Sequence, residues 1–225
     1  GILILMKLIL SLKMWLKNIP WLILLLISGI IFYFIISERW IGGNGERWKT
    51  IVDSDGRGYY SYLPAILIYQ DLNFDFVLRA EASVYGNGEA DYPHLMNGQR
   101  GNKYFIGEAL LLTPFFLLAW FISWLTGFSL NGYNKIFFGS VSIAALFYLL
   151  LALVLITKLL RLYKIREVWI QVILIMLVFG TNIFHYTIYE PSVSHIYSFA
   201  AISAFLFFLK KYQLEKSSRF LILSS

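Results

Sequence analysis

Two carboxylates close together in a glycine-rich stretch are the first candidates for chemistry. Asp53 and Asp55 open the run Asp-Ser-Asp-Gly-Arg-Gly-Tyr-Tyr. A carboxylate can take a proton from an attacking hydroxyl group, so either residue could act as a general base. The glycines allow the backbone to approach a neighbouring group closely. An exposed Asp-Gly turn without chemistry is the alternative interpretation.

A second candidate group surrounds Glu190, which is flanked by His185 and His195. Glu190 is the only acidic residue between Glu167 and Glu215 and follows a long apolar run. An ionisable residue at membrane depth is a candidate for function, although Glu190 could simply cap the next helix. The two histidines lack a nearby carboxylate motif of the kind that binds a metal ion. His195 and Glu190 are therefore candidates for substrate binding.

Three basic residues accompany the first pair of acids. Arg57, Arg100 and Lys103 could hold a phosphate or pyrophosphate, since Arg offers a bidentate fork and Lys a point charge. Solvated loop charges are the alternative. Tyr59 begins a segment, Tyr59–Asp71, that we expect to form a short amphipathic helix at the membrane surface, where tyrosine is enriched. Tyr59 is a further candidate for substrate binding.

The elements that must position these residues are strongly apolar. Hydrophobic residues make up 59% of the 225 and charged residues 14%, whereas soluble domains have about 45–50% and about 25%. Several uncharged runs are long enough to cross a hydrocarbon core of about 30 Å. We expect an all-α, polytopic integral membrane protein.

The charge and cysteine content exclude several classes of function. The formal charge is +6, but the region 38–103 carries seven basic and nine acidic residues, so the excess lies elsewhere. No basic stripe with interleaved aromatic residues is present, and we expect no nucleic-acid partner. The chain has no cysteine, which excludes disulfides and thiolate metal sites.

The positions of Lys and Arg predict the number of membrane crossings. Eleven of the 19 fall in three patches, within residues 7–17, 158–166 and 210–219. Cytoplasmic ends of membrane helices collect Lys and Arg, so the three patches should share one side. An even number of crossings must then separate consecutive patches. We expect four crossings, at Pro20–Ser37, Ile136–Thr157, Trp169–Phe184 and about Ser192–Leu209.

The remaining apolar run, Phe105–Thr126, is expected to stay at the outer surface. It carries Glu108 near its start, Pro114 near its middle and two tryptophans near its end. A peripheral pair of short helices, broken at the proline, suits these residues better than a straight span. An ordinary transmembrane helix is the alternative, and it would place the patch at 158–166 outside.

Four segments of the chain form a recognisable series. They are Asp53-Ser-Asp55-Gly-Arg-Gly-Tyr-Tyr60-Ser-Tyr-Leu-Pro64, Lys103-Tyr104-Phe-Ile-Gly107 followed by Leu-Leu-Thr-Pro114, the run Asn134–Arg161, and Tyr189-Glu190-Pro191. In this order they resemble the N-terminal part of the GT-C membrane glycosyltransferases, and most closely protein-mannosyltransferase and aminoarabinose-transferase-like proteins.

The resemblance implies transfer of a sugar from a polyprenyl-phosphate donor to an acceptor at the extracytoplasmic face of a bacterial inner membrane. Asp55 is the best match to the catalytic base, with Asp53 as the second choice. Arg57 and Lys103 would offset the charge of the lipid phosphate. Glu190 would orient the acceptor, or a divalent metal ion if one is used. The expected partners are the donor, membrane lipid and an acceptor that the sequence does not identify.

In this interpretation the chain has three parts. Residues 1–19 form a cytoplasmic basic segment, residues 20–211 the membrane region that resembles these transferases, and residues 212–225 the start of a truncated C-terminal continuation. The membrane region includes an outer loop, 38–104, and the peripheral helices, 105–126.

Two other classes of function stay open. A transporter or flippase of a lipid-linked or small solute would place polar groups in the middle of its spans, and a non-catalytic membrane scaffold would make the outer acids interchangeable.

Overall fold

A computed structural model describes residues 21–86, 92–96, 99–216 and 219–220. The predicted basic segment at residues 1–19 lies outside the described residues. The elements are a first helix, Trp21–Trp40, then α2 (Asp55–Pro64), α3 (Val77–Tyr85), β1 (Pro93–Met96), β2 (Gln99–Asn102), α4 (Gly107–Thr126), α5 (Lys135–Leu162), α6 (Glu167–Phe179), α7 (Ile183–Ile188) and α8 (His195–Glu215).

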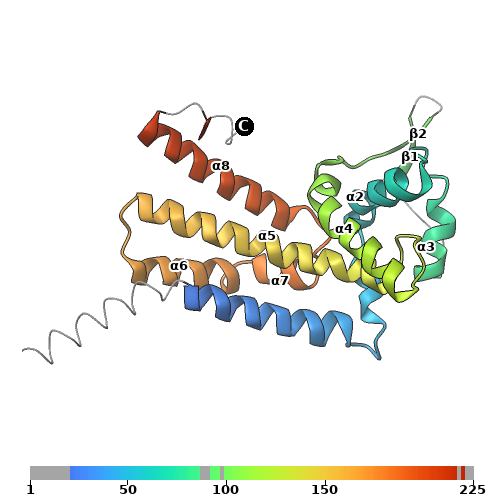
Figure 1. The fold of residues 1–225 in the computed structure, drawn as a ribbon, viewed down its shortest axis with the longest axis horizontal. Coiled ribbons are helices and arrows are strands. Elements are labelled where there is room, and N and C mark those ends of the chain that lie inside the picture. The colour runs from blue at the N-terminus through green and yellow to red at the C-terminus, as the bar shows by residue number, and fades with distance from the viewer. Residues whose placement is uncertain (1–20, 87–91, 97–98, 217–218, 221–225) are drawn as a thin grey trace, which may run out of the picture.

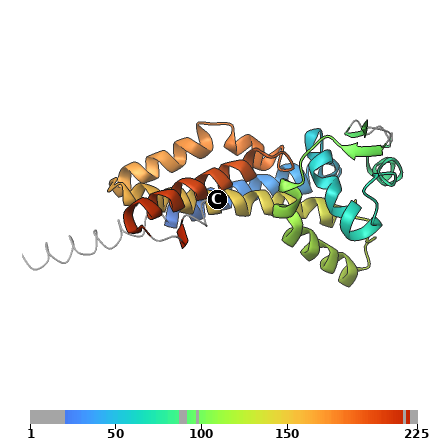
Figure 2. The same ribbon diagram turned by 90° about the horizontal axis from the view of Figure 1, so that it is seen from above.

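Helix α5 is the centre of a helical bundle. Figures 1 and 2 show the first helix, α6 with α7, and α8 running alongside it. Trp21 lines a small cavity with Thr157 and Lys158, whereas Trp40 lies against Gly139. The first helix and α5 are therefore antiparallel. The chain leaves the first helix and enters α5 at the same end of the bundle.

The start of α5 is fixed by an asparagine cap. The side chain of Asn134 accepts hydrogen bonds from the backbone N–H groups of Ile136 at 2.8 Å and Phe137 at 3.2 Å. These are two of the N–H groups that have no partner inside a helix. Ala144 and Ala145 are fully buried further along α5. Such small side chains let neighbouring membrane helices approach closely.

Three described helices are long and apolar enough to cross a membrane, which is consistent with a membrane protein. They are Trp21–Trp40, Gly107–Thr126 and Lys135–Leu162. The first helix corresponds to the predicted crossing Pro20–Ser37 from Trp21 onward, and the third contains the predicted crossing Ile136–Thr157. The predicted crossing at Trp169–Phe184 is instead divided, because α6 ends at Phe179 and α7 begins at Ile183. Helix length and composition do not confirm a count of four.

Helix α4 corrects the prediction of two short peripheral helices. It is one continuous helix of 20 residues with Pro114 inside it. A proline in a helix removes one hydrogen bond, but packing on α5 holds both halves of α4 in line. The ring of Phe116 lies 4.8 Å from that of Phe137, and the Tyr148 hydroxyl donates to the carbonyl of Leu111 at 2.8 Å.

The polar region 41–106 folds at one end of the bundle, on the right of Figure 1, and we call it the end region. It contains α2, a π-helical turn at Ala65–Tyr69, α3 and a hairpin of β1 and β2. The hairpin is a small departure from the all-α prediction. The amphipathic helix expected at Tyr59–Asp71 corresponds to most of α2 and the π-helical turn.

A buried tyrosine attaches the end region to the bundle. The hydroxyl of Tyr60 in α2 donates to the carbonyl of Gly132, just before α5, at 2.6 Å. Its ring also meets that of Phe138 edge to face, at 5.6 Å. Burial raises the pKa of Tyr60 well above its usual value, so the hydroxyl remains a donor. The middle of α2 is thereby held against the start of α5.

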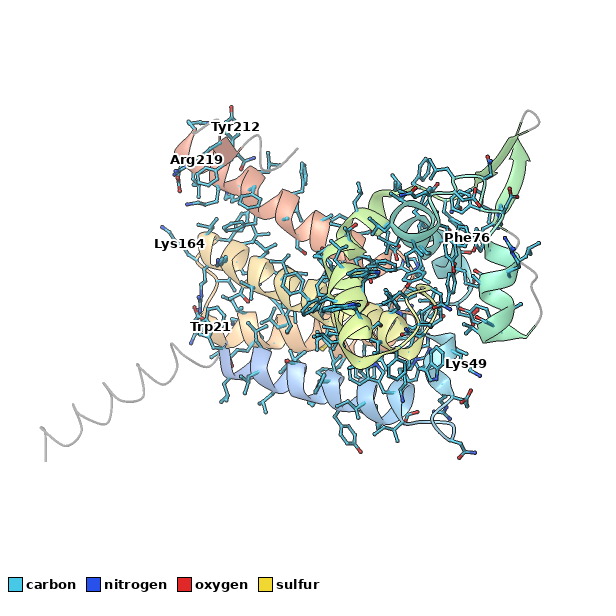
Figure 3. All side chains as sticks on the ribbon, turned by 45° about the vertical axis from the view of Figure 1, so that its right-hand side comes forward. Trp21, Lys49, Phe76, Lys164, Tyr212 and Arg219 are labelled. Atoms are coloured by element: carbon cyan, nitrogen blue, oxygen red, sulfur yellow. The ribbon has the colours of Figure 1, made fainter. Side chains whose placement is uncertain are left out.

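The described basic patches lie at the opposite end of the bundle. Figure 3 shows Lys164 and Arg219 at one end, with Lys49 and Phe76 of the end region at the other. At the basic end, the ammonium of Lys210 lies 4.3 Å from the ring centre of Tyr163, which joins α8 to the end of α5. The patches at 158–166 and 210–219 therefore share one end.

Candidate active site

A polar cleft of about 390 Å³ lies where the end region meets the bundle. Three separate parts of the chain line it: the end of the first helix with the turn after it, the start of α2, and the segment from α7 to α8. Four of the seven predicted site residues, Asp53, Asp55, Glu190 and His195, are among the lining residues. The lining consists of Arg39, Thr50, Ile51, Asp53, Ser54, Asp55, His185, Tyr189, Glu190, Ser192, Val193 and His195.

The two aspartates flank a residue with an unusual backbone conformation. Ser54 has φ 49° and ψ −132°, a region that costs a non-glycine residue on the order of 1–3 kcal/mol. Its N–H donates to Oδ1 of Asp53 at 2.8 Å. The N–H of Gly56 then donates to the carbonyl of Asp53 at 2.9 Å, which begins α2. This turn brings both Asp53 and Asp55 to the cleft.

A close contact between α2 and the segment before α8 builds the cleft. Gly56 lies so near Ser192 that a Cβ atom would be 1.9 Å from the Ser192 hydroxyl oxygen and 2.7 Å from its carbonyl oxygen. The same hydroxyl lies 3.4 Å from the backbone nitrogen of Asp53. Tyr197 secures the segment from α8, because its hydroxyl donates to the carbonyl of Pro191 at 2.7 Å. Only glycine fits at position 56.

Asp55 is held by Tyr104, in the segment between β2 and α4. The hydroxyl of Tyr104 donates to Oδ1 of Asp55 at 2.5 Å. Burial, and then the hydrogen bond and charge of Asp55, raise the pKa of Tyr104, so the donor stays protonated. The ring of Tyr59 lies 4.7 Å from that of Tyr104, and the Lys103 ammonium lies 5.2 Å from the Tyr104 ring centre. Tyr59 and Lys103 thus support Tyr104 and do not line the cleft.

The opposite wall of the cleft carries the second predicted acid. Nε2 of His185 lies 3.5 Å from Oε1 of Glu190, and both side chains are about half exposed. The His185 ring also stacks on that of Tyr189, with centres 5.2 Å apart. His195 lies 4.1 Å from the ring of Tyr186. Glu190 and His195 therefore face the same space as the two aspartates.

Arg57 points away from the cleft. Its guanidinium forms an ion pair with Glu81 of α3, which is buried. Tyr92 donates to the other oxygen of Glu81 at 2.6 Å, and the guanidinium lies over the ring of Tyr85 at 4.7 Å. Burial lowers the pKa of Arg57, but the hydrogen bond and charge of Glu81 outweigh burial and raise it. Arg57 joins α2 to α3 within the end region. The side chain of the third basic candidate, Arg100, lies outside the described residues.

Arg39 is a cleft residue that the sequence analysis missed. It lies in a π-helical turn, Ile35–Trp40, at the end of the first helix, and its side chain is 7% exposed. Nη2 donates to the carbonyl and the hydroxyl of Thr50, the latter at 2.9 Å, while the buried Nε has no acceptor. No carboxylate of a described residue forms an ion pair with Arg39. An arginine that closes an apolar run looks in sequence like an ordinary interface anchor.

The cleft does not carry a ready-made metal site. Among the described residues, no group of three or more His, Asp and Glu side chains is arranged to hold a metal ion. The metal-binding role suggested for Glu190 therefore lacks its ligand set in this part of the chain, and we derive no step through a metal.

Comparisons with known proteins return no match, whether with protein-family models, with curated proteins or with solved structures. The function of the cleft must therefore be inferred from its own residues.

Proposed function

We propose that this chain transfers a sugar from a polyprenyl-phosphate carrier to a hydroxyl acceptor at the extracytoplasmic face of a bacterial inner membrane. The observation that carries the proposal is the cleft itself. It collects the carboxylates of Asp53, Asp55 and Glu190, from segments more than 130 residues apart, around one buried arginine. The cleft also lies at the end of the bundle opposite the basic patches, the end expected outside the cytoplasm.

The proposal includes four membrane crossings in this orientation. The first helix and α5 are antiparallel, and the chain passes between them at one end of the bundle. An even number of crossings must therefore separate them. Helix α4 is the only described helix between them that is long and apolar enough to cross, so we assign it to the outer surface. The pair α6 with α7, and then α8, supply the third and fourth crossings.

Asp55 is the base in the mechanism that we propose. Its carboxylate takes the proton of the acceptor hydroxyl as that oxygen bonds to C1 of the sugar. The bond between C1 and the phosphate oxygen breaks, and the lipid phosphate leaves with the electron pair. Tyr104 supports this role, since its hydrogen bond of 2.5 Å orients the carboxylate. Asp53, which accepts a hydrogen bond from the backbone of Ser54, is the second candidate.

Arg39 replaces Arg57 and Lys103 as the residue that offsets the charge of the leaving phosphate. Arg57 is paired with Glu81, and neither it nor Lys103 lines the cleft. Arg39 lines the cleft and has no ion-pair partner among the described residues. A buried guanidinium without a carboxylate carries an uncompensated desolvation cost, which a bound phosphate would offset. Its planar fork also suits two phosphate oxygens.

The proposal is tested by transfer of radiolabelled sugar from polyprenyl-phosphate donors, with the chain reconstituted in membranes. Asp55→Asn and Arg39→Gln should each lower the rate at least about 100-fold, the scale of one general base or one charge-stabilising group. Glu46→Gln is the matched control, because Glu46 is an outer acid outside the cleft, paired with Lys49. An inserted Asp55→Asn variant with full activity removes Asp55 from the mechanism. Donor transport across the membrane without transfer would favour the flippase alternative.

A further inference from the structure

A second cavity, of about 340 Å³, opens between α4, α5 and the end of the first helix. We call it the α4–α5 groove. Its walls are almost entirely apolar, with Trp40, Phe115 and Ile122 among the lining residues. Among the described residues, Lys135 is the only charged one that lines it. It shares no lining residue with the polar cleft. Two features of α5 indicate that the groove is a binding site.

The first feature is Gly139 in the wall of the groove. Glycine in a helix interior lowers the stability by about 1 kcal/mol relative to alanine. A glycine inside a helix is therefore usually explained by a neighbouring group that leaves no room for a side chain. Gly139 has none, because a Cβ atom would lie 3.6 Å from the Trp40 ring, an ordinary van der Waals distance. Its backbone is also regular helix, without a positive φ. The packing of the chain does not require glycine here. A larger side chain at position 139 would, however, fill part of the groove.

The second feature is the position of Lys135. It is the first residue of α5 and its side chain is exposed. The positive end of a helix dipole disfavours a cation there. None of the ion pairs among the described residues involves Lys135. An anion at the outer end of the groove would satisfy both charges.

We propose that the α4–α5 groove binds one acyl chain of an anionic phospholipid, with the phosphate against Lys135. From Lys135 to Ile143 the groove follows nine residues of α5, whose eight steps span about 12 Å of helix. One wall, formed by Leu118 and Ile122, is partly exposed, so a chain can enter sideways from the bilayer. Moving a chain from bilayer to groove gains little hydrophobic energy. Selectivity must therefore come from the shape at Gly139 and the charge at Lys135. The site does not depend on glycosyl transfer.

The test is native mass spectrometry of the chain in mild detergent with equal amounts of phosphatidylglycerol and phosphatidylethanolamine. We expect the unmodified chain to retain phosphatidylglycerol preferentially. Lys135→Gln should lower that preference about fivefold, the scale of one lysine at an anionic surface, and Gly139→Leu should remove bound lipid of both kinds. Matched controls are Lys49→Gln, at the same end of the molecule, and Gly29→Leu, at an exposed helical glycine with nothing within 4 Å of a Cβ.

Equal retention of the two lipids, or a Lys135→Gln variant that behaves like Lys49→Gln, would overturn the proposal. A dimer that forms without lipid and is lost in Gly139→Leu would show instead that a second copy covers the groove. If Gly139→Leu does not fold, Gly139→Ala narrows the same groove without a clash, and reduced retention of phosphatidylglycerol is then the expected result.

Discussion

Gly56→Ala should separate the two halves of the polar cleft, because the contact with Ser192 leaves no room for a methyl group. The added Cβ would lie 1.9 Å from the Ser192 hydroxyl oxygen, 2.5 Å from its Cβ and 2.7 Å from its carbonyl oxygen. The hydroxyl can rotate away, but the carbonyl belongs to a buried backbone that Tyr197 holds through Pro191. Overpacking of this kind costs about 1–3 kcal/mol. Alanine gains up to about 1 kcal/mol over glycine in a helix, so a net loss of up to about 2 kcal/mol remains after that gain in full.

The measurement is thermal unfolding in detergent, where that loss corresponds to a fall of up to about 8 °C in Tm. Gly107→Ala is the control, since it also changes a glycine in the first turn of a helix and finds nothing within 4 Å. The control should gain about 0.5–1 kcal/mol. Ser192→Gly removes two of the three clashing atoms and should recover part of the loss in the double variant. A Gly56→Ala variant as stable as Gly107→Ala would refute the docking of α2 on the segment before α8.

Three further changes test the surroundings of the cleft. Glu81→Gln leaves the Arg57 guanidinium without its buried partner and should cost about 3–5 kcal/mol in chemical unfolding. Tyr104→Phe removes the hydrogen bond to Asp55 and should cost about 1 kcal/mol at neutral pH. The pKa of Tyr104 is raised in the folded state, so its protonated hydroxyl contributes its full stability below the ordinary tyrosine pKa. That stability is lost as pH rises through the folded pKa. Comparing the free energy of unfolding of the unmodified chain and Tyr104→Phe at pH 7 and at pH 11 measures this loss. Ser54→Gly should raise the stability by about 1 kcal/mol in thermal unfolding, since glycine adopts a positive φ without strain.

That Asp53, Asp55 and Glu190 lie in one cleft could be predicted from the distribution of Lys and Arg along the sequence. The basic patches predict which segments lie outside, and outer segments joined by a few membrane helices have only a small area in which to meet. Charge pairing inside the end region could not be predicted in the same way. Arg57 meets Glu81 only because α3 folds back on α2, and no local pattern specifies that arrangement.

Helix α4 and Arg39 show two limits of local patterns. Pro114 cannot donate a backbone hydrogen bond within α4, which is why the sequence predicts a break there. The aromatic packing of Phe116 on Phe137 nevertheless keeps the helix continuous. For Arg39, the sequence shows a cation at the end of an apolar run, where interface anchors are common. Its importance lies in the π-helical turn that buries it beside Thr50, and π-helical turns have no reliable sequence signal.

The contact between the start of α2 and Ser192 also has a consequence in time. The backbone of Asp53 and the hydroxyl of Ser192 are separated by 139 positions in the chain. At a synthesis rate of about 5–20 residues per second, the ribosome needs about 7–28 s to make the second partner after the first. During that interval the strained turn at Ser54 lacks the surface that holds it in the folded chain. The cleft can close only after the segment that carries Ser192 has been made, so this late part of the chain completes the site.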